Sequence, residues 1–184
     1  MTGSHCAGWS RPRARGLAWP LVGLSWLSAA TACARPVATD EEKAARVAEM
    51  VADIAEAFPG VESISVAEAG RLLEKDSIVL IDARDPAERA VSMIPGSIAA
   101  AEFEADPGRY ADVAAVAYCT IGYRSSRYAA RLTAEGIPVR NLGGSILAWT
   151  HEGGPLVGPD GPTTRLHVYG ETWDLAPGRY ETIW

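Results

Sequence analysis

Cysteine is scarce in this chain of 184 residues, which contains only Cys6, Cys33 and Cys119. Three cysteines so far apart do not form the dense framework of a small disulfide-stabilised domain. The three histidines are equally scattered, so no spacing among them indicates a metal site. Internal repeats and low-complexity tracts are also absent, which argues against a repeat architecture.

Acidic residues are missing from the start of the chain, where the first carboxylate is Asp40. Residues 1–32 contain three arginines, then an apolar stretch over Leu17–Ala30, and end in the small-residue pattern Ala-Thr-Ala. This layout predicts a secretory signal peptide over residues 1–32 with an A-x-A cleavage site.

Cys33 directly follows the predicted cleavage site, so the segment also resembles a lipoprotein signal. That resemblance implies that Cys33 becomes the lipidated first residue of the mature chain. The alternative is an uncleaved membrane anchor, because the apolar stretch approaches the ~18 residues of a span; Pro20, Gly23 and several serines weaken it. We therefore expect an exported protein of the periplasm or cell envelope, with membrane attachment at the N-terminus where Cys33 is acylated.

Removal of residues 1–32 makes the chain more acidic. The full sequence has 17 basic and 23 acidic residues, and the loss of three arginines leaves 14 basic residues and a net charge of −9. Nucleic acid is not an expected partner of such a chain. Cleavage also leaves Cys119 as an unpaired thiol in an oxidising compartment, which calls for a functional reason.

Hydrophobic periodicity predicts an amphipathic helix over residues 39–58, within an N-terminal segment 33–60. Thr39 and Glu42 have the spacing of a capping box at its start. One face of this helix carries the apolar residues Val47, Met50, Val51, Ile54 and Phe58. We expect this face to cover the domain that follows.

Apolar strands alternate with helices in the rest of the chain. The expected strands are 61–65, 77–82, 113–119 and 137–142, and the expected helices include 66–76 and 125–136. This order predicts a single-domain α/β fold with a mainly parallel sheet, whose ligands bind beyond the carboxyl ends of the strands. Residues 159–184 are rich in glycine and proline and are expected to form an irregular tail packed by its aromatic residues.

Cys119 lies at the carboxyl end of a buried strand, just before a short loop and a helix. Backbone N–H groups of that loop, the positive end of the helix and Arg124 favour the thiolate, and the pKa of cysteines in such settings falls from ~8.5 to ~3.5–7.5. The same arrangement binds anions, and Gly122 lets the loop curl. A thiolate in an anion-binding loop suits attack on sulfur, phosphorus or arsenic. An inert core cysteine is the alternative, which Gly122 and Arg124 disfavour.

Three motifs, in the same order, resemble the rhodanese-homology domains. "CTIGYRS" at 119–125 resembles the active-site loop C-x-x-G-x-R-[ST] of that family. "VLIDARDPAERAVSMIPGSI" is similar to I-D-[VA]-R-x-x-x-E followed by G-H-I-P-G-A, and "VRNLGGSILAWTHEGGPLV" resembles N-L-x-G-G-x-x-x-W with a G-x-P-[VL] ending. The resemblance covers residues 61–158.

The resemblance implies the rhodanese-like fold, a parallel sheet flanked by helices, and places the persulfide-forming cysteine at Cys119. The implied sulfur-binding cradle consists of Thr120, Ile121, Gly122, Tyr123, Arg124 and Ser125. Asp82 and Arg84 match the acidic and basic positions of the early motif, where a structural and a catalytic role both stay open. Ser92 and Met93 replace the usual Gly-His pair, and we interpret that histidine as one that orders the fold.

The implied activity is sulfur transfer, of the kind catalysed by thiosulfate sulfurtransferases, with the donor left open. Four residues separate Cys119 from Arg124, whereas the phosphatases and arsenate reductases of this fold resemble C-x5-R, so sulfur transfer is favoured over those reactions. The expected partners are a small sulfane-sulfur donor and a thiol, cyanide-like or protein acceptor, with no metal or organic cofactor. A persulfide carrier or binding module without appreciable small-molecule turnover is the alternative.

Overall fold

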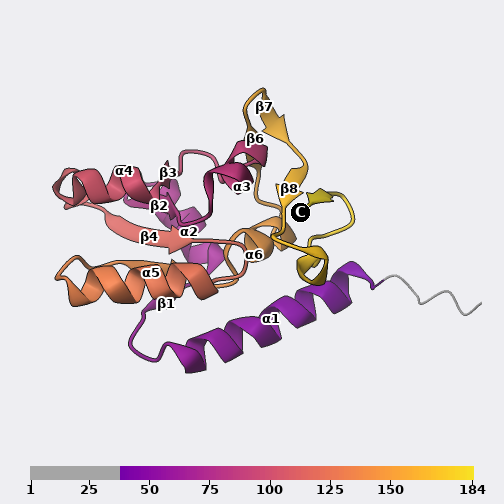
Figure 1. Ribbon diagram of the computed structural model, residues 1–184, viewed down its shortest axis with the longest axis horizontal. Coiled ribbons are helices and arrows are strands. Elements are labelled where there is room, and N and C mark those ends of the chain that lie inside the picture. The colour runs from indigo at the N-terminus through magenta and orange to yellow at the C-terminus, as the bar shows by residue number, and fades with distance from the viewer. Residues whose placement is uncertain (1–37) are drawn as a thin grey trace, which may run out of the picture. The chain divides into compact units, whose positions relative to one another are not determined.

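Five parallel strands form the central sheet in the computed structural model, which describes residues 38–184 (Figure 1). Their spatial order is β1-β5-β4-β2-β3, and every neighbouring pair is parallel. The strands are β1 (Ser63–Ile64), β2 (Ile78–Asp82), β3 (Ile98–Ala99), β4 (Ala114–Tyr118) and β5 (Arg140–Leu142). The predicted signal segment 1–32 and the candidate lipidation residue Cys33 lie outside the described residues.

Helices connect these strands, as the alternating sequence pattern predicts. They are α1 (Asp40–Ala57), α2 (Val66–Leu73), α3 (Pro86–Val91), α4 (Ala100–Ala105), α5 (Tyr123–Ala134) and α6 (Ser145–His151), with 3-10 turns η1 (Pro107–Tyr110) and η2 (Glu171–Trp173). Thr39 caps α1 through the expected capping box with Glu42, and the Ser65 side chain caps α2. The predicted α/β fold with a flanked parallel sheet is therefore confirmed.

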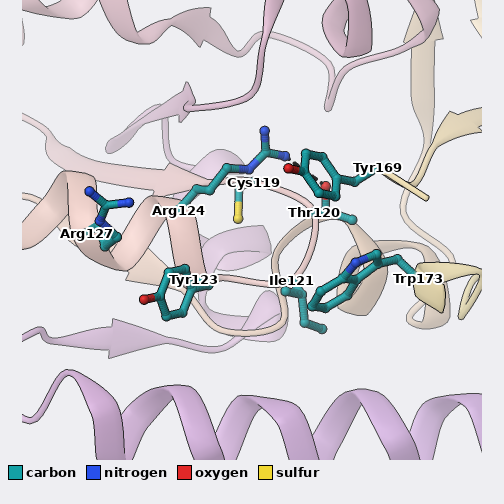
Figure 2. A pocket seen from close by; sticks show the side chains of 8 residues that line it. All are labelled: Cys119, Thr120, Ile121, Tyr123, Arg124, Arg127, Tyr169 and Trp173. Carbon is teal, nitrogen blue, oxygen red and sulfur yellow. Dashed lines mark hydrogen bonds between the residues drawn. The ribbon is translucent and has the colours of Figure 1, made fainter. Parts of the chain in front are cut away.

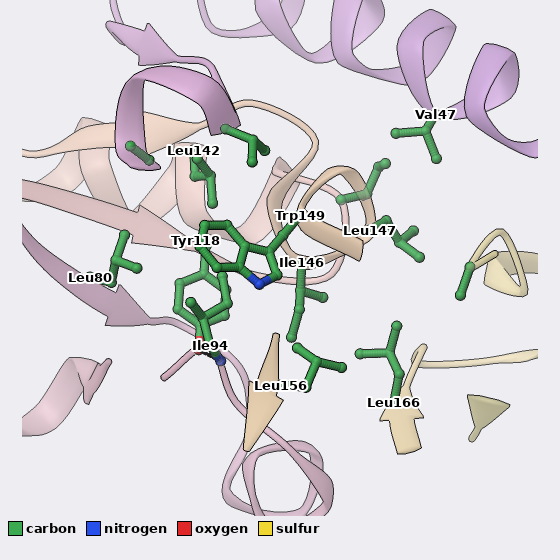
Figure 3. Close-up of a cluster of buried hydrophobic side chains, with 14 of the residues drawn as sticks. Val47, Leu80, Ile94, Tyr118, Leu142, Ile146, Leu147, Trp149, Leu156 and Leu166 are labelled. Carbon is green, nitrogen blue, oxygen red and sulfur yellow. Dashed lines mark hydrogen bonds between the residues drawn. The ribbon is translucent and has the colours of Figure 1, made fainter. Parts of the chain in front are cut away.

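Both faces of the sheet are buried. Because side chains alternate along each strand, each strand contributes to a core on either face. In β4, Val116 and Tyr118 point into one core, and Ala117 points into the other. Helices α4 and α5 contribute Phe103 and Leu132 to the core on the Ala117 side. The opposite core is the larger one and includes Leu80, Leu142, Ile146, Leu147 and Trp149 (Figure 3).

Helix α1 covers this larger core, in agreement with the prediction from its apolar face. Val47 is buried, and Met50, Val51 and Ile54 are partly buried against the same cluster. Gly144 allows the close approach, because a Cβ atom there would lie 3.2 Å from a methyl carbon of Val51. In Figure 1 the helix runs along the outside of the domain.

Residues 159–184 are not an irregular tail. They contribute to the antiparallel pair of β6 (Leu156–Gly158) and β7 (Gly161–Thr163), and they form the parallel pair of β8 (Arg165–His167) and β9 (Glu181–Ile183). Leu166 and Val168 are completely buried in the larger core, which fixes the segment to the domain. These strands were not predicted from the sequence, because each is only three residues long and the segment is rich in glycine and proline.

Candidate active site

Cys119 follows β4 directly, at the carboxyl end of the central strand. Its side chain is only 1% exposed, and its backbone N–H donates to Ser145 Oγ at 3.0 Å. Helix α5 begins at Tyr123, two residues earlier than predicted, so the loop between strand and helix is very short. This tight connection holds the sulfur against the first turn of α5.

Hydrogen-bond donors converge on the Cys119 sulfur. The N–H of Gly122 donates to Sγ at 3.1 Å, and the Ser125 hydroxyl lies 3.5 Å from it. Burial alone raises the pKa of the thiol, but the hydroxyl and N–H of Ser125, the N–H of Gly122 and the charge of Arg124 outweigh burial and lower the pKa of Cys119 below its ordinary value. The site therefore favours a thiolate, as expected from the sequence.

Gly122 makes this geometry accessible to the backbone. Its φ of +120° lies in a region that side-chain-bearing residues rarely adopt, and it precedes the first residue of α5. A Cβ atom at this position would also meet the Asn141 amide nitrogen at 3.4 Å. The sharp turn at Gly122 aims its own N–H at the sulfur.

Arg124 forms a two-pronged ion pair with Glu88 of α3. Its two terminal nitrogens lie 2.6 and 2.7 Å from the carboxylate oxygens, and one of them also donates to Thr120 Oγ1 at 3.1 Å. Burial raises the pKa of Glu88, but the hydrogen bonds from Arg124 and from the Asp85 N–H outweigh it and leave that pKa lowered. The role of Arg124 in binding an anionic donor stays a prediction, because both terminal nitrogens of its guanidinium group already donate hydrogen bonds to Glu88.

A pocket of about 500 Å³ opens over Cys119 (Figure 2). Its lining consists of Cys119, Thr120, Ile121, Tyr123, Arg124, Arg127, Tyr169 and Trp173. Tyr123 is half exposed at this pocket and also makes an edge-on contact with Phe58, the C-cap residue of α1. The structure thus brings together the thiolate candidate, most of the predicted loop and two aromatic residues from the C-terminal segment.

Asp82 and Arg84 lie apart from the pocket, in a buried ion pair. Asp82 Oδ2 accepts from Arg84 at 2.7 Å and from the Tyr118 hydroxyl at 2.7 Å. Arg84 also donates to the carbonyl of Ser92 at 2.6 Å, and Met93 pairs with Val157 in a β-bridge. None of these residues lines the Cys119 pocket, so their contacts favour the structural reading for Asp82, Arg84 and the replaced Gly-His pair.

Comparison with known proteins assigns the family. A model of the rhodanese-like domain matches residues 65–152. The chain is similar to a sulfurtransferase from Allochromatium vinosum, with 36% identity over 96 residues that span 50% of this chain and 89% of the relative. The chain belongs to the rhodanese-like sulfurtransferase family. The resemblance of the motifs to rhodanese-homology domains is confirmed, whereas the predicted export signal lies outside the matched residues.

Solved structures of two sulfurtransferases are similar to this chain. The chain is similar to a thiosulfate sulfurtransferase from Pseudomonas aeruginosa, with 26% identity and a TM-score of 0.50 over 65% of this chain and 23% of that chain. It is also similar to a human single-domain sulfurtransferase, with 24% identity and a TM-score of 0.42 over 49% of this chain and 96% of that chain. The five-stranded parallel sheet and the similarity to the Pseudomonas aeruginosa enzyme agree with the rhodanese fold of this family.

Sequence reasoning missed several residues of the rhodanese-like site. Glu88 was visible as the glutamate of the I-D-[VA]-R-x-x-x-E motif, and Asn141 as the asparagine of the N-L-x-G-G motif, whose second glycine is replaced by Ser145. Tyr169 and Trp173 had no signal beyond being aromatic, and they lie beyond the end of the family match at residue 152. Among residues 38–184 no group of His, Cys, Asp and Glu side chains is placed to hold a metal ion.

Replacement of Ser125 by alanine is expected to slow the reaction of Cys119 at acidic pH. The variant loses a hydroxyl near the sulfur, so the pKa of the thiol rises and less thiolate is present at a given pH. We expect alkylation by iodoacetamide to be about tenfold slower below the pKa, the size of one hydrogen bond to a charged group. The pH dependence of the alkylation rate measures this.

Ser126→Ala serves as the control for that experiment. Ser126 is the neighbouring buried serine of α5, and it has no hydrogen bond to Sγ. A pH profile that shifts equally in both variants would show that the effect comes from α5 packing and not from the Ser125 hydroxyl.

Proposed function

We propose that this protein transfers sulfane sulfur through a persulfide on Cys119. The observation that carries the proposal is the set of donors on the sulfur, from Gly122 and Ser125, at the base of an open pocket. These donors stabilise the Cys119 thiolate before it attacks and again when it leaves. Family membership and the name of the Allochromatium vinosum relative support the same reaction class.

The reaction proceeds by two displacements at sulfur. The Cys119 thiolate attacks the outer sulfur of the donor, a Cys119–S bond forms, and the S–S bond of the donor breaks with its electron pair leaving on the donor remainder. A thiolate or cyanide acceptor then attacks the outer sulfur of the persulfide, and the Cys119 thiolate leaves. No net oxidant or reductant is consumed.

The short loop supports sulfur over a tetrahedral oxyanion as the group bound at Cys119. The donors from Gly122 and Ser125 contact the sulfur itself, and Arg124 is directed to Glu88. A phosphate or arsenate ester on Cys119 would need donors spread around three further oxygens. We therefore expect the unaltered protein to have no phosphatase activity that depends on Cys119.

Intact mass spectrometry before and after mixing with a sulfane donor tests the proposal. We expect one added sulfur, about 32 Da, and its removal by cyanide with formation of thiocyanate. Many turnovers per protein identify an enzyme. An adduct that forms once and is discharged only by a protein acceptor identifies a carrier, and no adduct with any donor would refute the proposal.

We also propose that the protein is exported, with residues 1–32 removed and Cys33 acylated. The support is the arginine-rich start, the apolar stretch and the Ala-Thr-Ala pattern before Cys33. Peptide mapping of envelope fractions is expected to recover no peptide from residues 1–32, and Cys33→Ser is expected to release the protein from membranes. Recovery of an intact cytoplasmic form that begins near Met1 would contradict export, whereas an intact chain in membranes would indicate the uncleaved anchor.

A further inference from the structure

Two aromatic residues of the C-terminal segment form one wall of the Cys119 pocket. In Figure 2 Tyr169 and Trp173 lie on one side of the Cys119 sulfur, and Tyr123 and Arg127 lie on the other. Trp173 is partly buried against the larger core, whereas Tyr169 is 61% exposed and adopts a positive φ of +73°. This wall comes from residues outside the family match, which ends at residue 152.

The C-terminal segment is held in place around these residues. Leu166 and Val168 are completely buried on one side of Tyr169. On the other side of Trp173, the carbonyl of Ala176 accepts a hydrogen bond from Lys43 of α1 at 2.9 Å, and Tyr180 donates to the carbonyl of Gly154 at 3.1 Å. The wall is thus anchored both before and after its aromatic residues.

The pocket is larger and more apolar than transfer of a lone sulfur requires. Its volume of about 500 Å³ falls in the range of sites for organic ligands, about 300–1,000 Å³. Ile121, Tyr123, Tyr169 and Trp173 supply hydrophobic or aromatic surface next to the reactive sulfur. Such surface binds the organic body of a donor, and it offers nothing to a small, strongly hydrated inorganic dianion.

The charges at the pocket favour a donor with a single negative charge. Arg124 is paired with Glu88, lies 3.6 Å from Asp85, and is covered by the Tyr169 ring at 5.1 Å. Arg127 also lines the pocket, and within residues 38–184 it has no ion pair. One cation without an ion pair at the pocket is poorly suited to a doubly charged donor such as thiosulfate.

We propose, on the basis of the function proposed above, that the donor is an organic sulfane-sulfur monoanion whose apolar body packs against Trp173 and Tyr169. Thiosulfonates and organic persulfides have this chemistry. With a thiosulfonate, the Cys119 thiolate takes the outer sulfur, the bond from that sulfur to the sulfonyl sulfur breaks, and the electron pair leaves on the sulfinate. One monoanion enters and one leaves, so the charge at the pocket is balanced throughout.

Three sulfur donors separate the effect of the donor's apolar body on kcat/KM from the effect of its charge. Benzenethiosulfonate and methanethiosulfonate share the reacting group and differ in the body, whereas thiosulfate has no organic body and carries two charges. In Trp173→Ala we expect kcat/KM for benzenethiosulfonate to fall about tenfold, the loss expected for an aromatic contact and its buried area, with less than a twofold change for thiosulfate. Tyr169→Ala provides a second variant at an exposed position, where folding is not at risk.

Trp184→Ala is the matched control, because Trp184 is an exposed aromatic residue of the same segment that does not line the pocket. We expect Trp184→Ala to leave kcat/KM unchanged for benzenethiosulfonate, methanethiosulfonate and thiosulfate. Equal losses for all donors in Trp173→Ala and Tyr169→Ala, or no loss with benzenethiosulfonate, would overturn the donor assignment while the Cys119 persulfide stands. Absence of a persulfide with every donor in the unaltered protein would overturn the proposed function itself.

Freeing Arg124 tests the charge argument independently. In Glu88→Gln the guanidinium keeps its place but loses its counter-charge, so thiosulfate should gain relative to methanethiosulfonate. We expect the ratio of their kcat/KM values to rise about tenfold, the effect of about one well-placed charge. An unchanged ratio would show that the Glu88 pairing does not select the charge of the donor.

Discussion

Cys119→Ser is expected to abolish the sulfur adduct and to reduce sulfur transfer at least about a thousandfold. A serine hydroxyl stays protonated where the thiol ionises, and its oxygen attacks sulfane sulfur poorly. The side chain is almost the same size and keeps the donors from Gly122 and Ser125, so we expect only a small change in thermal stability. Intact mass spectrometry and thiocyanate formation measure the two losses.

Cys33→Ser provides the control for this experiment. Cys119 is the free cysteine of residues 38–184, so an adduct on the described domain has no other thiol to occupy. The Cys33 variant should therefore retain an adduct of about 32 Da and full turnover. An adduct that persists in Cys119→Ser, or that maps to Cys33, would contradict the assignment.

The position of Cys119 was predictable because local sequence determines it. The five-residue apolar strand β4 ends at Tyr118, and the pattern of α5 begins within a few residues, so the cysteine had to lie at the carboxyl edge of a parallel sheet. The start of α5 was predicted two residues late, because Tyr123 and Arg124 carry no capping signal. Its N-cap is Gly122, which acts through its φ of +120° rather than through a side chain.

The partners of the loop were not predictable in the same way. Glu88 lies 36 residues before Arg124, and only the packing of α3 against the loop brings the two together. Tyr169 and Trp173 reach the pocket because Leu166 of β8 and the nearby Val168 are buried in the core, and β8 is too short to show a period of two. Long-range packing of this kind leaves no local sequence pattern. The sequence therefore predicted the nucleophile, Cys119, but not the residues that form the walls of its pocket.

Arg124→Ala is expected to destabilise the domain by about 1.5–3 kcal/mol, because it removes two hydrogen bonds to the largely buried Glu88 carboxylate. Glu88 is 3% exposed at its side chain, and the remaining donors are the Asp85 N–H at 3.1 Å and the Thr120 hydroxyl at 3.4 Å. Glu88→Gln should cost clearly less, since Arg124 is 28% exposed and its charge stays hydrated. Urea unfolding of both variants at neutral pH measures the difference.

The pH dependence of stability distinguishes this mechanism from a simple loss of packing. In the unaltered protein the pKa of Glu88 is lowered, so the stability it contributes is fully present above the unfolded value of about 4.5 and is lost as the pH falls through the lowered pKa. Without Arg124 we expect burial to outweigh the Asp85 N–H and the charge of Arg84, so that the pKa of Glu88 is raised instead. The folded state then binds a proton more readily than the unfolded state, and Arg124→Ala should gain stability as the pH falls from neutral toward the unfolded value of about 4.5.

The double variant Arg124→Ala/Glu88→Gln completes the test. Removal of the buried charge should restore much of the stability lost in Arg124→Ala and should abolish its gain at lower pH, because no carboxylate remains to be protonated. A double variant as unstable as the sum of the two single variants would show that Arg124 and Glu88 act independently. The ion pair would then be a contact without energetic coupling, and the position of Arg124 over the pocket would have to depend on Thr120 and the Tyr169 ring alone.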